Sequence, residues 1–194
     1  MQTELLLQGN DHGEEDLRKL LQIEKATSRL SRLNQTLLLL TRIDNEQFGE
    51  PVAVPFEVII QNKLDAFAPM IEAKGIQLSH SLQPTVWHAH PELADILINN
   101  LLSNAIHHNL PGGSLSVALS AGLLVVRNTG KPLAVDPAQL FVRFQKSDAA
   151  SNSVGLGLAI VKEICELYGW QIQYETEGET HQVSITFIHK SHSS

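Results

Sequence analysis

Apolar residues recur at every third or fourth position through the first quarter of the chain. This spacing is typical of the buried seam of a coiled coil, and Leu38, Leu39 and Ile43 widen it toward its end as a helical bundle requires. The pattern predicts one helix from about Glu14 to Asn45, roughly 48 Å long. The regular members of the seam are Ile23, Ala26, Leu30, Leu33, Leu37 and Leu40.

A shorter helix is predicted from Met1 to Gln8, with a turn between Gly9 and Gly13. Together the two helices would form a hairpin with very unequal arms. Because the short arm cannot cover the apolar face of the long one, we expect another chain, or residues that precede Met1 in a longer protein, to cover the rest. The alternative is a long surface helix that packs on its own domain.

Beyond Pro51 the pattern changes to alternating helices and strands. Since most strands follow one another while the helices are set apart, we expect an α+β fold, a two-layer sandwich in which a mixed sheet carries helices on one face. The expected domains are residues 1–48 and 49–190. Helices are predicted at 56–73, 91–108 and 155–168, strands at 52–54, 76–82, 85–88, 114–120, 123–127, 170–176 and 181–188, and an irregular stretch at 128–154.

Composition narrows the class of protein. The chain has 194 residues, of which 43% are hydrophobic, enough for a proper core. Its 14 basic and 21 acidic residues give a net charge of −7, so we expect no nucleic-acid partner. The only cysteine, Cys165, cannot form an internal disulfide, which fits a reducing compartment, and no apolar run is long enough to be a membrane segment.

Two asparagine-containing motifs carry candidate chemistry. Asn100 and Asn104 are one turn apart on the same face of a predicted helix, and carboxamides suit Mg²⁺ and phosphate oxygens. Asn128 ends a predicted strand beside Gly130, where a polar side chain can read the edge of a base. Taken alone, each motif is more simply explained as surface asparagines or a turn.

Two further segments have residues that favour the binding of anions. Gly155-Leu156-Gly157-Leu158 leads into an apolar helix, whose free N–H groups and dipole favour negative charge. Before it, Phe141 and Phe144 can anchor a segment from which Arg143 and Lys146 reach phosphates. A lone pair of glycines is a weak signal, but the order and spacing of all four segments is specific.

In this order the four segments resemble the N, G1, F and G2 boxes of the catalytic domain of sensor histidine kinases. That domain has the Bergerat-type ATP fold, shared with topoisomerase and mismatch-repair ATPases. The long helix resembles the second helix of the dimerisation and histidine-phosphotransfer domain of these kinases. The matching segments are residues 100–108, 126–130, 141–144 and 155–158.

The resemblance implies an enzyme that uses ATP and Mg²⁺ to phosphorylate a histidine on the dimerisation domain, for relay to a response regulator. It implies that Asn104 ligands Mg²⁺, that Asn100 assists at the phosphates, and that Asn128 accepts a hydrogen bond from the adenine amino group. Residues 131–154 would form the ATP lid. The implied ATP-binding residues are Asn100, Asn104, His107, His108, Asn128, Gly130, Lys131, Arg143, Phe144, Lys146, Gly155, Leu156, Gly157 and Leu158.

The chain departs from the family pattern at several positions. Asn128 stands where most of the family has Asp, Pro132 where a second glycine is usual, and His107 where Lys or Arg is usual. We expect Asn128 still to accept from adenine, and nucleotide affinity to rise modestly below the reference histidine pKa of about 6.5 as His107 gains charge.

The largest departure concerns the phosphoacceptor, which in the family is a histidine followed by an acidic residue and then a Thr-Pro pair. No such motif is present, and His12 is best explained as a turn residue. We therefore expect residues 1–48 to be a truncated hairpin without the acceptor, and we expect the chain to contain no catalytic residue and not to phosphorylate itself.

The partners implied are a second copy of the chain, through the long helix, and the receiver domain of a response regulator. The expected location is cytoplasmic, as part of an inner-membrane sensor. One alternative is a nucleotide-binding and dimerisation module without transfer activity. Another is an anti-sigma-type serine kinase, against which the long bundle helix argues.

Overall fold

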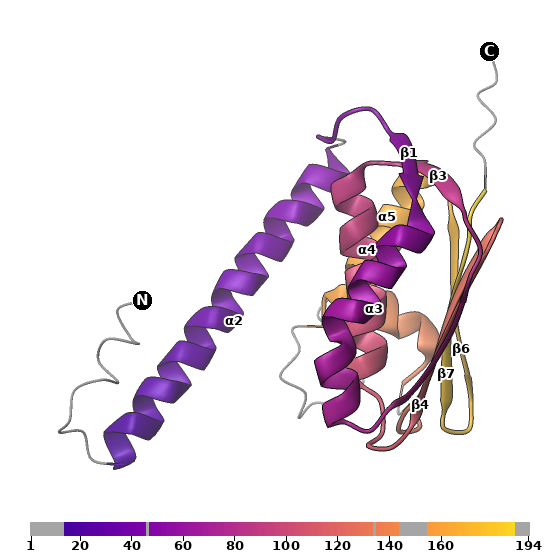
Figure 1. Cartoon of the computed structure of the whole chain (residues 1–194). Helices are drawn as coiled ribbons and strands as arrows, with labels where there is room; N and C mark the ends of the chain where they lie inside the picture. Colours follow the sequence, from indigo (N-terminus) through magenta and orange to yellow (C-terminus); the bar gives the residue numbers. More distant parts are fainter. Residues whose placement is uncertain (1–13, 46, 134, 144–154, 189–194) are drawn as a thin grey trace. The chain divides into compact units, whose positions relative to one another are not determined.

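The computed structural model of the chain describes residues 14–45, 47–133, 135–143 and 155–188. The chain divides into two compact units, Met1–Thr41 and Arg42–Ser194 (Figure 1). The helix predicted for residues 1–8 and the turn that contains His12 lie outside the described residues, so both stay predictions.

Helix α2 (Glu14–Asp44) is the described part of the first unit, and its last residues belong to the second. Its bounds agree with the predicted helix to within one residue. Ile23, Leu30 and Leu37, three members of the predicted seam, are exposed apolar side chains. The helix therefore presents an apolar face of the kind that packs in a bundle.

The second unit is built on a mixed five-stranded sheet with the strand order β2-β4-β5-β7-β6. β2 and β4 are parallel and every other neighbouring pair is antiparallel. A separate antiparallel pair joins β1 (Val52–Pro55) to β3 (Val86–Ala89). The strands of the large sheet are β2 (Gln77–Leu82), β4 (Ser114–Ser120), β5 (Leu123–Thr129), β6 (Gln171–Glu177) and β7 (Thr180–Thr186).

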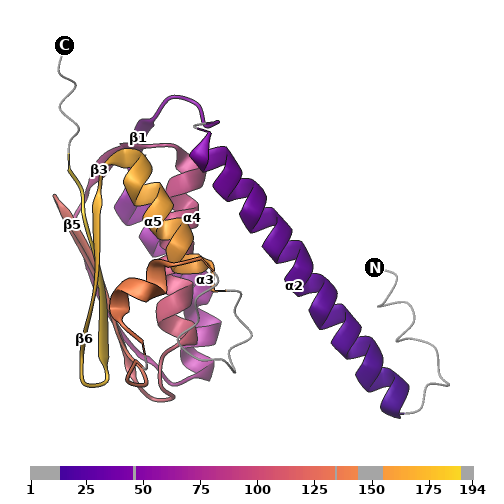
Figure 2. The same ribbon diagram turned by 180° about the vertical axis from the view of Figure 1, so that it is seen from behind.

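Three helices cover one face of this sheet: α3 (Phe56–Ala73), α4 (Pro91–His107) and α5 (Gly157–Tyr168) (Figures 1 and 2). Alternate residues of the central strands point toward the helices and are buried, whereas the residues between them form the other face of the sheet. The predicted fold class, a mixed sheet with helices on one face preceded by a long helix, is confirmed. The inward-facing apolar residues are Leu115, Val117, Leu119, Leu124, Val126, Val183 and Ile185.

Near the candidate motifs, two element bounds differ from the predicted ones and one short helix is additional. β5 continues to Thr129, because β7 supplies ladder partners as far as the pair of Thr129 with Thr180. Helix α5 begins at Gly157 and not at Gly155, whose φ of +73° is not helical. A short 3₁₀ helix, η1 (Pro137–Phe141), lies in the stretch predicted to be irregular.

Candidate functional site

The Asn100 side chain meets the start of α5. Buried leucines and isoleucines of α4 face the sheet, and Asn100 and Asn104 lie half-buried on another face of the same helix. The Asn100 Nδ2 atom donates to the Ile96 carbonyl at 2.8 Å. A Cβ on Gly157 would lie 3.1 Å from Asn100 Oδ1, so glycine allows the first turn of α5 to approach this carboxamide closely. The structure thus brings the predicted N and G2 boxes together.

The carboxyl end of α4 is capped by a lysine from the end of α3. Lys74 Nζ donates to the carbonyls of Ile106 and His107, at 2.9 Å each. A cation at this position satisfies terminal carbonyls and complements the helix dipole. The cap therefore holds the backbone of His107, whose side chain is exposed.

A polar network joins the end of α4 to the end of β5. Asn109 is 6% exposed, and its Oδ1 atom accepts from the Thr129 hydroxyl at 2.6 Å while its Nδ2 atom donates to the Ser114 carbonyl at 2.9 Å. The backbone N–H of Ser114 in turn donates to Thr129 Oγ1 at 3.0 Å. A Cβ on Gly113 would overlap both Thr129 Oγ1 and Asn109 Oδ1, so this network requires glycine there.

Asn128 lies on the helix-facing side of β5 and is 7% exposed. Its Nδ2 atom donates to the Thr129 carbonyl at 2.8 Å. Because a carbonyl can only accept, the amide nitrogen must face it, and Oδ1 is then the acceptor that remains for a ligand. This orientation suits the role that the resemblance implies, which is acceptance of a hydrogen bond from adenine.

Gly130 is enclosed by groups from two neighbouring segments. A Cβ at this position would lie 2.7 Å from His181 Cδ2 and 3.2 Å from the His108 carbonyl oxygen. The Gly130 N–H donates to the Glu179 carbonyl at 2.7 Å. The end of the predicted N box and the G1 glycine are therefore in contact, with a buried histidine from β7 on the other side.

The turn before α5 presents two glycines and a buried leucine. Gly155 has a φ of +73°, in the left-handed region that favours glycine, and Leu156 is 3% exposed. Leu158, in the first turn of the helix, is also buried. The N–H groups at a helix start lack partners within the helix, so this turn has the backbone character of an anion site.

Arg143 makes an ion pair with α5. Its Nη2 atom lies 2.9 Å from Glu163 Oε1. Phe141, the last residue of η1, packs edge-on against Tyr174 with ring centroids 6.4 Å apart. The other two residues predicted in this segment, Phe144 and Lys146, lie outside the described residues. The aromatic anchor predicted for this segment is therefore present at Phe141.

Residues 89–191, more than half of the chain, match the family described as histidine kinase-, DNA gyrase B- and HSP90-like ATPase. The chain belongs to this family. The family predicted from the four boxes is confirmed.

Relatives of this chain include sensor proteins. The chain is 30% identical over 182 residues to the sensor protein QseC of Escherichia coli, an alignment covering 90% of this chain and 40% of QseC. It is 32% identical over 175 residues to the heme sensor protein HssS of Staphylococcus aureus, covering 86% of this chain and 38% of HssS. The chain thus spans about two fifths of the length of these relatives.

A solved structure shares the fold. Full-length ShkA, crystallised in complex with AMPPNP, superimposes with a TM-score of 0.71 at 19% identity, covering 92% of this chain and 40% of ShkA. At this level of identity the likeness concerns the fold alone.

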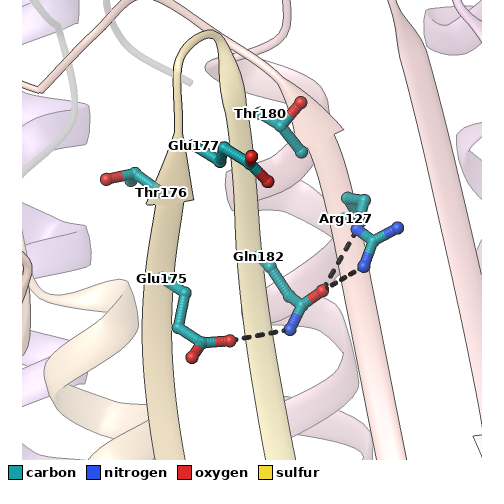
Figure 3. Close-up of a pocket in the computed structure, with 6 residues that line it drawn as sticks. All are labelled: Arg127, Glu175, Thr176, Glu177, Thr180 and Gln182. Carbon is teal, nitrogen blue, oxygen red and sulfur yellow. Dashed lines mark hydrogen bonds between the residues drawn. The ribbon is translucent and has the colours of Figure 1, made fainter.

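A polar pocket of about 640 Å³ lies on the sheet face that the helices do not cover, with Arg127 of the predicted G1 segment in its lining (Figure 3). Across it Gln182 accepts from Arg127 Nε at 3.1 Å and donates to Glu175 at 2.9 Å. Its lining includes none of the predicted ATP-binding residues.

No three His, Cys, Asp or Glu side chains in the described part of the chain are grouped so that they could hold a metal ion. None of the described helices combines the length and the apolar character that a membrane span needs.

The sequence did not single out four of the residues that shape this candidate site: Lys74, Asn109, Tyr174 and His181. One signal was available for His181, which shares the inward-facing positions of β7 with Val183 and Ile185. A polar residue at an inward position of an alternating strand is buried and needs partners. Lys74 and Asn109 carry no such signal, because their partners depend on the tertiary fold.

Proposed function

We propose that this chain binds Mg·ATP between α4, the end of β5 and the start of α5, as the catalytic portion of a sensor histidine kinase. The observation that carries the proposal is the contact of Asn100 with Gly157, which joins a carboxamide-bearing helix face to a helix start. Helix starts and carboxamides both suit phosphate oxygens. The match of residues 89–191 to an ATPase family supports an ATP ligand.

The phosphates would lie at the start of α5. Backbone N–H groups from Gly155 to Leu158 would donate to phosphate oxygens, and the Asn100 carboxamide would assist from α4. Phosphoryl transfer needs little covalent work from the protein and depends on positioning and charge neutralisation. In a chain of net charge −7 this neutralisation must come from local donors and a cation.

Asn104 is the residue we propose to hold Mg²⁺. It lies one turn beyond Asn100 and is half-buried, and its carboxamide oxygen is a ligand that Mg²⁺ accepts. Mg²⁺ usually binds through one or two protein oxygens together with phosphate oxygens and water, so a single carboxamide fits that chemistry. When bound, the ion would neutralise charge on the phosphates.

The adenine would lie against the end of β5. Asn128 Oδ1 would accept from the adenine amino group, and Gly130 would allow the base to approach the backbone. His107 and His108 at the end of α4 would contact phosphate and nucleoside. Lys131, Arg143, Phe144 and Lys146 would contribute from the lid formed by residues 131–154.

In the longer protein, we propose, the phosphoryl group passes to a histidine on the dimerisation domain and then to a response regulator. Two copies would associate through α2, and the catalytic portion would act in the cytoplasm. The 194 residues contain no histidine followed by an acidic residue and a Thr-Pro pair, so this chain would not phosphorylate itself. The same observation favours one alternative, a nucleotide-binding and dimerisation module without transfer activity.

Incubation with γ-labelled ATP, Mg²⁺ and a separately supplied acceptor helix tests the proposal. We expect acid-labile, base-stable label on the acceptor and none on this chain. Asn104→Ala should abolish labelling, whereas Asn62→Ala, at an exposed position of α3, should not. Nucleotide binding without any label on the acceptor would favour the alternative, and label on this chain would contradict the predicted absence of self-phosphorylation.

A further inference from the structure

His181 is a buried side chain beside the predicted base-recognition residues Asn128 and Gly130. It is 5% exposed and lies opposite Asn128 in the pairing of β7 with β5. Both side chains occupy inward-facing positions of their strands, where their neighbours are Val126 and Val183. A polar ring at such a position needs a partner for each nitrogen.

Both nitrogens of His181 have partners, and these partners belong to different segments. Nε2 lies 3.0 Å from the Lys131 carbonyl oxygen, and Nδ1 lies 3.0 Å from the Tyr174 hydroxyl. Because the carbonyl can only accept, Nε2 carries the proton, and in the neutral ring Nδ1 accepts the tyrosine hydroxyl proton. Burial raises the pKa of Tyr174 to about 12, so this hydroxyl remains a donor at neutral pH.

These contacts hold the backbone that follows β5. His181 binds the carbonyl of Lys131 and packs its ring against Gly130, where a Cβ would lie 2.7 Å from Cδ2. Tyr174 holds His181 and also packs edge-on against Phe141. Two residues from β6 and β7 therefore contact the first residue of the predicted lid and the aromatic residue ten positions later.

We propose that His181 is a positioning residue for base recognition: by holding Gly130 and Lys131 it sets the end of β5, and so orients Asn128 toward the nucleotide. Tyr174 supports it by fixing the ring. This inference rests on the proposed ATP site, in which Asn128 accepts from the adenine amino group.

The test compares the affinities for Mg·ADP and Mg·IDP by titration calorimetry. Inosine carries an oxygen where adenine carries the amino group, so only ADP uses the Asn128 acceptor. For His181→Leu we expect affinity for ADP to fall about tenfold while affinity for IDP changes by less than about threefold. His181→Gln, whose amide nitrogen can still donate to the Lys131 carbonyl, should recover most of the lost ADP affinity.

Two further variants complete the test. Tyr174→Phe removes one hydroxyl and keeps the ring against Phe141. It should weaken ADP binding about threefold and leave IDP binding unchanged. If His181→Leu does not fold, Tyr174→Phe and His181→Gln together test the positioning role. His80→Leu, an exposed histidine of β2, is the control and should change neither affinity.

Unchanged ADP affinity in His181→Leu or Tyr174→Phe, or equal losses of ADP and IDP affinity, would overturn the positioning role. Failure of His181→Gln to recover ADP affinity would also overturn it. Asn128→Ala separates this result from failure of the proposed function. If the parent protein binds neither nucleotide, or if Asn128→Ala leaves the ADP to IDP ratio as it was, the proposed function fails and this inference fails with it.

Discussion

At the scale of single residues, the orientation of the Asn128 amide predicts how substitutions there change the affinity for ADP. Its nitrogen faces the Thr129 carbonyl, and the oxygen is the acceptor for a base. Asn128→Ala should weaken ADP binding about tenfold, which is the cost of losing one hydrogen bond at a buried site. Asn128→Asp has a stronger acceptor and should bind ADP at least as tightly as the parent protein. Titration calorimetry measures both, and an Asn128→Ala protein that binds ADP like the parent would remove the role.

The burial of Cys165 predicts a slow reaction of its thiol in the folded chain. Burial in α5 raises the pKa of its thiol from 9.0 to about 12, with Glu166 adding to the effect. At pH 8 only about one thiol in ten thousand would be ionised in the folded chain, so a thiol-reactive dye should label native protein far more slowly than protein unfolded in urea. Equal labelling rates in the two states would contradict this.

The same shift in the thiol pKa determines how the stability of the folded chain changes with pH. The thiol pKa is higher in the folded chain than in the unfolded chain. The contribution of the Cys165 thiol to the free energy of unfolding is therefore fully present below pH 9 and is lost as the pH rises toward 12. Cys165→Ala should therefore show a smaller decrease in the free energy of unfolding than the parent protein between pH 8 and pH 10.

At the scale of secondary-structure elements, the joint between α4 and β5 depends on Gly113. A Cβ there would overlap Thr129 Oγ1 and Asn109 Oδ1, so Gly113→Ala must displace the network that ties the two elements. We expect the free energy of unfolding to fall by about 2 kcal/mol or more, measured by urea denaturation. Gly122→Ala, in the hairpin between β4 and β5 with no atom within 4 Å of its Cβ, should change it by less than about 0.5 kcal/mol. Similar losses in both variants would contradict the steric argument.

Element bounds were predictable where local chemistry decides them. α3 and β4 have the predicted bounds to the residue, because Gly75 ends the first and alternating apolar residues define the second. The end of β5 was not predictable in this way. Asn128 and Gly130 favour a turn, but Asn128 pairs with β4 and β7, and Thr129 pairs with Thr180 of β7, some fifty residues later.

The candidate site was likewise predictable only in part. The order of the four boxes was enough to predict the family, and Asn100, Gly130 and Gly157 have contacts that suit their implied roles. His181 and Tyr174 were not predictable as part of the site. Lys131, the partner of His181, is distant in sequence, and it is the sheet order β5-β7-β6 that brings Lys131, His181 and Tyr174 together.

At the scale of the whole molecule, the apolar face of α2 predicts self-association. Ile23, Leu30 and Leu37 are exposed, with Leu30 at 62%, and they recur at the spacing of a bundle seam. Light scattering at high protein concentration should give twice the mass of one chain. Changing all three residues to Gln removes the apolar face without adding charge, and should reduce the mass to that of one chain.

The decisive comparison is with a variant that alters the same helix but not its seam. Gln22, Ser31 and Gln35 are exposed polar residues of α2, and their replacement by Ala should leave the mass doubled, since alanine favours the helix and touches none of the seam. Nucleotide affinity should be equal in both triple variants, because every residue proposed to bind ATP belongs to the second unit. A parent chain with the mass of one copy at every concentration would contradict the dimer proposed here while leaving the ATP site untouched.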